Sequence, residues 1–368
     1  RIWREKFPFH EVINKFRSAD SHSLLSLQDN LNGGNNNVHW NTICSFSTTY
    51  HVDTIEFSPD HRVALCGSYE LDEESRRRVG QLLVFTQTDE SHFYLSLQLD
   101  CAGLLDLSWL DNVTAVGAQA NGEAVLWHLD ENDRTNCAPT YRRITDALLL
   151  STQVAREKYV PHSALFLVRL LNFLFGLCRI RDTLQENVYY SGGDDSVCYA
   201  WDERCYSKPI LSLKHEVGVC SVVAQPIGTN TISTGCYDGF LRIWDLRMSG
   251  DRISDSSRPV LLICSSGGGG VWRHKWLTSR YVLMAAMHSG FVAVGPVCSP
   301  GFNGDAKTLE PLACYRPSAK LAYGIDCYVH HSNSSTADSH LNAVVATCSF
   351  YDNTIDFSRL TLPTTPCG

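Results

Sequence analysis

Short apolar segments and tight polar turns alternate along most of the chain. Apolar and polar residues alternate with a period of two in FLRIWD (240–245) and EAVLWH (123–128). That period is typical of half-buried strands, and the Asp-Gly and Asn-Gly pairs just before these segments are typical of hairpin turns. The same strand–turn–strand pattern recurs in GSYEL (67–71), GAQANGEAVLWHLD (117–130), SGGDDSVCYAWDER (191–204), TGCYDGFLRIWDLR (234–247), AAMHSGFVAVG (285–295) and CSFYDNTIDFS (348–358).

These six copies share a register. The residue five positions after the turn is tryptophan in three of them, and the full set is Phe85, Trp127, Trp201, Trp244, Gly295 and Ser358. Trp127 follows Phe85 by 42 residues, and Trp244 follows Trp201 by 43. Four short strands per blade of a β-propeller require a period of about this length. We therefore predict an all-β propeller with six visible blades and a seventh supplied by residues 41–50 or by one of the longer spacings.

The propeller is expected to span residues 41–360, after an N-terminal extension of unknown structure at 1–40. One apolar run, 164–180, does not fit the repeat, and we treat residues near 160–186 as an unaligned hydrophobic insertion. Arg169 and Asn172 interrupt this run, and it is shorter than the roughly 20 residues that cross a bilayer. A buried strand or helix segment is therefore favoured over a membrane span.

Composition narrows the range of partners and compartments. The net charge of −8 disfavours a nucleic-acid binder and favours a neutral or cationic partner. The 15 cysteines are scattered and form no C-x-x-C pair, which indicates reduced thiols in a cytoplasmic protein and no metal site. The chain starts without Met and without an apolar signal segment, which is compatible with a fragment.

Two copies of the repeat resemble WD-repeat blades, because strand, turn and Trp-Asp stand in register in SGGDDSVCYAWDER and TGCYDGFLRIWDLR. In the second of these, the match to the hydrogen-bond network inside a WD blade comprises His215, Ser233 or Thr234, Asp238 and Trp244. The resemblance implies a structural role for these residues. WD-repeat folds mostly serve as binding platforms, so the fold alone does not identify an activity.

Seven segments together resemble a more specific family: YHVDTIEFSP, AGLLDLSW, YSGGDDS, GGVWRHKW, MHSGF, AYGID and SFYDN. They are similar to the WD-repeat diphthine methyl ester hydrolases, a family also labelled diphthine methyltransferase. The resemblance implies a monomeric enzyme without a cofactor that removes the methyl ester from methylated diphthine on translation elongation factor 2. The alternatives are a non-enzymatic WD-repeat scaffold or substrate receptor and, third, a methyltransferase, although the sequence has no glycine-rich βα unit for a methyl donor.

The turns between second and third strands of a propeller lie on the same face as the loops that enter the first strands. His288, Ser289, Tyr237, Asp194, Tyr351 and residues 267–270 are therefore predicted around one mouth of the channel. His288 is the candidate general base, because a free imidazole has a pKa near 6.5. Ser289 is either a nucleophile or a replacement for the usual turn aspartate. It fits the second role better, because it is adjacent to His288.

Alignment of Trp276 with Trp109 and Phe57 places Arg273 opposite Asp106, with Asp326 at an equivalent position. Arg273 is predicted to bind the substrate carboxyl group or an oxyanion, unless it forms an ion pair with an acidic neighbour.

The family's substrate carries a quaternary ammonium, which aromatic faces and carboxylates bind best. The candidates for this role are Trp272, Tyr237, Tyr323, Asp194 and Asp326, although core packing also explains any single aromatic residue. The glycine run that contains Gly268 and Gly269 lacks the spacing of a phosphate-binding loop. It is predicted to allow close approach of a substrate or of backbone, so that valine at either glycine should impair activity more than folding.

Overall fold

The structure is a computed structural model that describes residues 38–89, 92–129, 137–142, 176–181, 187–202, 204, 208–226, 230–246, 260–265, 269–297, 307–309, 311–317, 321–330 and 340–364. The described part is all-β, as predicted, and its strands form six sheets. Residues 1–37 lie outside it, as do Gly268 and most of the apolar run.

Each sheet is built from strands that are close together in the chain. The first sheet contains β2 (His51–Phe57), β3 (Val63–Asp72), β4 (Arg77–Asp89) and β5 (His92–Ala102). The second contains β6 (Leu104–Trp109), β7 (Thr114–Gln119), β8 (Ala124–Leu129) and β9 (Cys137–Arg142). The third contains β10 (Gly176–Arg181), β11 (Val188–Gly193), β12 (Val197–Asp202) and β13 (Leu211–Lys214).

The remaining sheets follow the same order with two additions. The fourth contains β14 (Val219–Ala224), β15 (Thr231–Cys236), β16 (Phe240–Asp245) and β17 (Val260–Ser265), and β21 (Lys307–Thr308) pairs in parallel with β17. The fifth contains β18 (Arg273–Trp276), β19 (Val282–Ala285), β20 (Phe291–Val294) and β22 (Pro311–Tyr315). The sixth contains β23 (Ala322–His330), β24 (His340–Ser349), β25 (Thr354–Pro363) and, at its outer edge, β1 (His39–Ser47).

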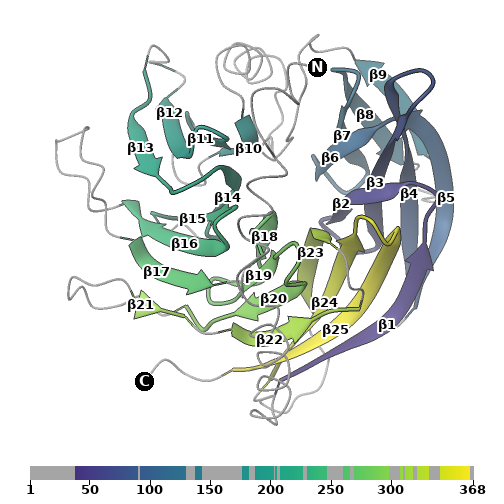
Figure 1. Ribbon diagram of the computed structural model, residues 1–368. Helices are drawn as coiled ribbons and strands as arrows, with labels where there is room; N and C mark the ends of the chain where they lie inside the picture. Colours follow the sequence, from purple (N-terminus) through teal and green to yellow (C-terminus); the bar gives the residue numbers. More distant parts are fainter. Residues whose placement is uncertain are drawn as a thin grey trace.

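The sheets are arranged around a centre with the first strand of each sheet innermost (Figure 1). Neighbouring first strands contact one another in the order β6, β2, β23, β18, β14 and β10. This is the arrangement of propeller blades, and the prediction of a β-propeller is confirmed. The repeat register is confirmed as well, because Phe85, Trp127, Trp201, Trp244 and Ser358 all lie on the third strand of a sheet, and Gly295 directly follows β20.

The N-terminal strand closes the sixth sheet. β1 pairs antiparallel with β25 from His39↔Thr361 to Ser47↔Thr354. Residues 41–50 therefore do not start a seventh blade, and that suggestion is wrong: the free edge of β25 takes up the segment. No strand of a seventh sheet lies in the described ranges, so a seventh blade stays a prediction.

The end of the unaligned apolar run supplies a first strand. Gly176–Arg181 forms β10, which pairs antiparallel with β11 from Gly176↔Gly193 to Arg181↔Tyr189. The third sheet thus has an innermost strand although this segment does not match the repeat pattern.

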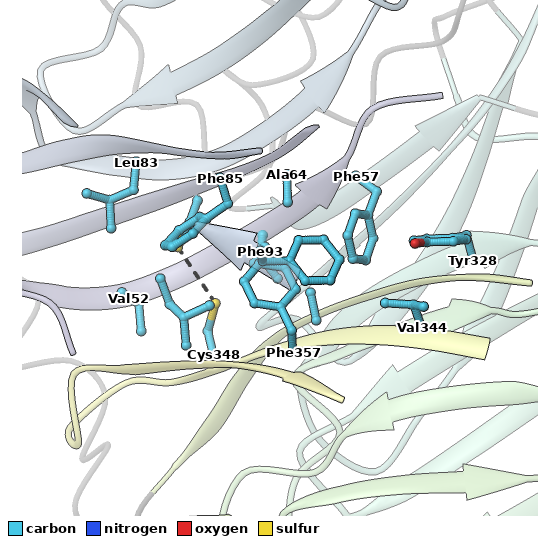
Figure 2. Close-up of a cluster of buried hydrophobic side chains, with 14 residues drawn as sticks. Val52, Phe57, Ala64, Leu83, Phe85, Phe93, Tyr328, Val344, Cys348 and Phe357 are labelled. Atoms are coloured by element: carbon cyan, nitrogen blue, oxygen red, sulfur yellow. Dashed lines mark hydrogen bonds between the residues drawn. The ribbon is translucent and has the colours of Figure 1, made fainter. Parts of the chain in front are cut away.

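The contact between the first and sixth sheets is an aromatic core (Figure 2). The rings of Phe93 and Phe357 stack at 4.0 Å, and those of Phe57 and Tyr328 meet edge-on at 5.0 Å. Burial of one large apolar side chain stabilises a fold by about 1.5–3 kcal/mol. Because the two sheets come from opposite ends of the chain, this core fixes the closure of the ring near the strands that carry the candidate site.

The predicted WD network lies in the third and fourth sheets. The Thr234 hydroxyl accepts a hydrogen bond from the Trp244 indole and forms one with His215 Nε2, both at 2.8 Å. Burial lowers the pKa of His215 to about 4, so the ring is neutral at physiological pH. Asp238 accepts a hydrogen bond from the Phe240 amide and forms an ion pair with Arg242 at 2.7 Å.

Replacement of Thr234 by valine should destabilise the protein by about 1–3 kcal/mol, because it removes the shared partner of His215 and of the buried Trp244 indole. Urea unfolding measures the loss. Thr231→Val is the matched control, since it makes the same change on the same strand at a half-buried position. Equal stability of the two variants would contradict the structural role of the network.

Candidate active site

The first strands carry an irregularity at the same end. The pairing of first and second strands shifts register around Asp53 in β2, Leu105 in β6 and Cys220 in β14, and between Ala322 and Ile325 in β23. In the fifth sheet, the Trp272 amide donates to the carbonyl of Ala285, which is also opposite Arg273. A bulge turns an extra side chain out of the strand. We call the end that carries these bulges the mouth.

An arc of aromatic rings crosses the mouth and includes Trp272 and Tyr323 from the irregular positions. The Trp272 ring lies 4.9 Å from Tyr323 and 6.1 Å from Tyr237. Tyr323 stacks on Phe350 at 4.7 Å, and Phe350 lies 5.3 Å from Tyr69. Three predicted residues are thus brought together from three sheets. The sequence analysis did not predict Phe350 and Tyr69 as part of the mouth. It selected residues at turn positions where the blades differ from one another, and neither residue is at such a position.

Asp194 adds a carboxylate at one end of this arc. Burial raises the pKa of Tyr237, and the neighbouring Cys220 and then Asp194 raise it further. Tyr237 and Asp194 both pack over Gly218, where an added Cβ would lie 3.1 Å from each. Burial also raises the pKa of the half-buried Asp194 carboxyl, followed by the charge of Asp195. Asp194 therefore lies where the sequence predicts it.

Arg273 reaches across the centre of the ring from the fifth to the second sheet. Its guanidinium donates to Asp106 Oδ1 at 2.6 Å and to the Leu105 carbonyl at 3.1 Å, and it lies 3.9 Å from Asp53 Oδ2. Burial lowers the pKa of Arg273, but Asp106 and Asp53 outweigh burial and raise it. Arg273 Nε has no acceptor among the described residues. The predicted position opposite Asp106 is confirmed, and the alternative left open by the sequence, an ion pair with an acidic neighbour, is present.

Asp326 lies one layer deeper than the sequence suggests. Its Oδ2 accepts the Phe57 amide at 2.7 Å, and its Oδ1 lies 3.7 Å from Lys275, which is bonded to Glu56 at 2.5 Å. Asp326 is thus level with Lys275 and not with Arg273, because the irregularity between Ala322 and Ile325 shifts β23 along its neighbour. It belongs to an ion cluster below the mouth.

Asp53 is the residue of the mouth that the sequence analysis missed. It is 4% exposed, and burial raises the pKa of its carboxyl to about 7, against the lowering charge of Arg273 and with a further raise from Asp106. The Trp272 indole is close enough to lower this pKa, yet neither Asp53 Oδ1 nor Trp272 Nε1 makes a hydrogen bond of normal geometry. The sequence shows an aspartate in the segment YHVDTIEF, but it does not show that this residue lies on a bulge.

The hairpin between β19 and β20 carries the predicted base and nucleophile. His288 is exposed in the turn, whereas Ser289 is buried and its Oγ accepts the Gly269 amide at 2.8 Å. The pairs Gly235↔Leu241 and Ala285↔Phe291 flank turns of equal length. By these flanking pairs Met287 corresponds to Tyr237 and His288 to Asp238, so the alignment of the turn was shifted by one residue.

Gly269 makes a close approach, and its neighbour is backbone. A Cβ added there would lie 2.1 Å from the Ala286 carbonyl and 2.9 Å from the Ser289 amide nitrogen. The glycine thus packs against the hairpin of its own sheet. Of the two predicted reasons for the glycine, close approach of backbone is the one that the structure shows, so valine at Gly269 should impair folding at least as much as activity. The prediction for Gly268 falls outside the described residues.

A buried histidine beside the mouth is fully engaged. His274 Nδ1 lies 2.6 Å from Ser221 Oγ, and Nε2 lies 2.7 Å from Ser233 Oγ, which also donates to the Val223 carbonyl. Because the proton of Ser233 is used there, Nε2 must donate and Nδ1 must accept from Ser221. Burial lowers the pKa of His274 to about 3. The ring joins the fourth and fifth sheets as a neutral group.

Comparison with known proteins places this mouth in context. The chain is 26% identical to mouse diphthine methyltransferase over 78% of this chain and 70% of the relative. It is 24% identical to the Dictyostelium discoideum homolog over 82% of this chain and 95% of the relative, and 23% identical to the Schizosaccharomyces pombe protein over 84% and 94%. This chain is thus similar to diphthine methyltransferases over about four fifths of its length. The predicted family resemblance is confirmed, and no family model matches the chain.

The similarity to diphthine methyltransferases extends over most of the chain, so it covers the propeller and not one blade. In the described ranges of this chain, no three His, Cys, Asp or Glu side chains are placed to hold a metal ion. The same residues include no helix long and apolar enough to cross a membrane. The nine cysteines whose side chains the structure describes are free thiols, and the Cys66 and Cys348 sulfurs lie 3.8 Å apart between the first and sixth sheets.

Proposed function

We propose that this protein is a hydrolase that removes the methyl ester from methylated diphthine on translation elongation factor 2, a late step of diphthamide biosynthesis. The relatives that are named diphthine methyltransferase support diphthine as the substrate. The observation that carries the proposal is the mouth itself, where an aromatic arc, a buried guanidinium and a buried carboxylate lie side by side.

The arc suits the quaternary ammonium of diphthine. Such a cation donates no ordinary hydrogen bond and is attracted by the faces of aromatic rings, by about 0.5–2 kcal/mol for each ring. Trp272, Tyr323 and Tyr237 supply three neighbouring rings, and Asp194 supplies a carboxylate beside them. The rings thus hold the ammonium end of the substrate.

Arg273 suits the ester end. Its Nη atoms are held by Asp106 and the Leu105 carbonyl, and Nε–H is left to donate. A fixed cation at this place stabilises the oxyanion that forms when water attacks an ester carbonyl. The lost methyl group leaves as methanol, so the reaction needs water and no methyl donor. The lack of a glycine-rich βα unit in the sequence supports hydrolysis over methyl transfer.

The direct test is incubation with elongation factor 2 that carries methylated diphthine, followed by mass spectrometry of the modified peptide. We expect the mass to fall by one methylene, with release of methanol and with no added methyl donor. Stable binding without any loss of mass would overturn the enzyme proposal in favour of a scaffold or substrate receptor. A gain of mass that depends on S-adenosylmethionine would favour a methyltransferase.

Trp272→Ala should raise KM for the modified protein about tenfold, which corresponds to the loss of about 1.4 kcal/mol of cation–π attraction. Trp272→Phe keeps a ring and should retain most of the affinity. Steady-state kinetics measures both, and Tyr94→Ala is the control, because it removes an exposed ring on the outer strand β5. An unchanged KM in Trp272→Ala would contradict the role of the arc.

A further inference from the structure

We propose that Asp53, and not His288, is the general base that activates the hydrolytic water. The inference rests on the proposed function and adds a catalytic residue to it. It stands on the position of the carboxylate, on what surrounds it and on the state of the other titratable groups.

The bulge in β2 turns the side chain of Asp53 toward the mouth. Asp53 is the extra residue of β2, between Val52↔Ser68 and Thr54↔Gly67. Its side chain is 6% exposed, and Oδ1 is buried without a hydrogen bond of normal geometry among the described residues. Buried polar atoms in native proteins almost always have partners, and an exception requires an explanation, of which a catalytic role is one. The unused acceptor of Asp53 and the unused donor of Arg273 lie on adjoining side chains.

The surroundings of Asp53 come from five other strands. Arg273 of β18 lies 3.9 Å away and, with the Trp272 indole just before it, favours the ionised carboxylate. Asp106 of β6 opposes ionisation. The remaining titratable neighbours are Tyr69 of β3, Tyr323 of β23 and Cys348 of β24, and the Asp53 charge raises the pKa of each, after burial as the larger cause. These three groups are neutral at physiological pH.

The opposing effects of burial and of Arg273 on the pKa of Asp53 suit a general base. Burial raises the pKa of Asp53 to about 7, so that near neutral pH a large fraction is ionised and the group is basic enough to accept a proton from water. The rival groups are already engaged. Glu56 is bonded to Lys275, and both nitrogens of His274 have partners inside the blades.

Asp53 alone then carries out both proton transfers of the reaction. Ionised Asp53 takes a proton from water as the water oxygen bonds to the ester carbon, and Arg273 stabilises the oxyanion. When the bond from carbon to the methoxy oxygen breaks, protonated Asp53 gives its proton to that oxygen and methanol leaves. The carboxylic acid product loses its proton to solvent, and Asp53 is again ionised.

Asp53→Asn should lower kcat on the methylated protein by at least about 100-fold with KM little changed, because the amide cannot accept the proton. In the wild type, kcat/KM should rise with pH through an apparent pKa near 7, and this limb should be absent from the residual activity of Asp53→Asn. His288→Ala and Ser289→Ala should keep the limb. Asp100→Asn, on the outer strand β5, is the matched control and should be unchanged.

Folding and function can be separated in the same set of variants. The folded-state pKa of Asp53 lies above its unfolded value, so this group opposes folding increasingly as pH rises from about 4 to about 7. Asp53→Asn should therefore be at least as stable as the wild type at pH 8, by thermal unfolding. A carboxyl carbon that titrates near 7 in ¹³C NMR and is missing in Asp53→Asn tests the group without any substrate.

The outcomes distinguish the two proposals. No hydrolysis by folded wild-type protein would overturn the proposed function, whatever the titration shows. Hydrolysis that survives in Asp53→Asn, or a carboxyl that titrates near 4, would overturn this inference alone. Loss of the rising limb in His288→Ala would return the role of the base to His288.

Discussion

Arg273→Met should destabilise the folded protein by about 3–5 kcal/mol and abolish hydrolysis. The guanidinium is the cation that compensates Asp106 and faces Asp53, and removal of one partner from a buried ion pair leaves an uncompensated charge. Methionine has a comparable length and no charge, so the result reports the charge and not a cavity. Chemical denaturation at pH 8 measures the loss of stability, because Asp53, whose pKa burial raises to about 7, is mostly ionised there.

Two comparisons make that result interpretable. Arg76→Met breaks an ion pair with Glu73 whose side chains are both more than 70% exposed, and stability should stay close to the wild type. Arg273→Met combined with Asp106→Leu removes both charges and should recover part of the loss. If the single Arg273→Met variant were as stable as Arg76→Met, the ion pair across the centre would not support the fold.

The two layers of charge explain why the centre of the ring is polar. Arg273 and Lys275 alternate on β18, and their partners Asp106, Asp53, Glu56 and Asp326 come from β6, β2 and β23. His274, between the two cations, points the other way and is hydrogen-bonded between sheets. The period of two thus sends cations toward the centre and the neutral ring into the blade. The upper layer serves the mouth, and the lower layer ties the first, fifth and sixth sheets together.

The repeat pattern was enough to predict the fold and part of the mouth. The strand–turn–strand phrases located the third strand of each blade and placed Tyr237, Asp194, Trp272 and Tyr323 at one end. It was not enough for residues whose role depends on a bulge, because a bulge adds one residue and shifts everything after it. Asp53 was missed for this reason, and Asp326 was placed one layer too high for the same reason.

The alignment of turns and the pairing of edge strands were also not predictable from the sequence. The His288 turn was aligned by its glycine, whereas the flanking strand pairs place it one residue away. Residues 41–50 have the pattern of a strand, but only the exposed edge of β25 decides which sheet receives that strand. The second question depends on a contact between segments some 300 residues apart, which a local pattern does not contain.

Gly269→Val should prevent the protein from folding stably, and we expect little soluble protein or a loss of more than about 3 kcal/mol. A Cβ at this position would lie 2.1 Å from the Ala286 carbonyl oxygen, and backbone at the start of a hairpin cannot move aside as a side chain can. The displacement caused by the valine would also break the hydrogen bond from the Gly269 amide to Ser289 Oγ. Soluble yield and thermal unfolding measure the effect.

Gly270→Val is the matched control for Gly269→Val. The added Cβ would lie 3.1 Å from the Met287 sulfur, which can move, and 3.2 Å from the Tyr237 Cα. The loss of stability should therefore be smaller, while the shifted Tyr237 weakens substrate binding at the aromatic arc. A Gly269→Val variant that folded as well as Gly270→Val but lost activity would show that the approach of substrate, and not of the Ala286 backbone, requires glycine there. If the expected result is obtained instead, Gly270 is the glycine whose replacement mainly affects activity, one residue beyond the position that the sequence suggested.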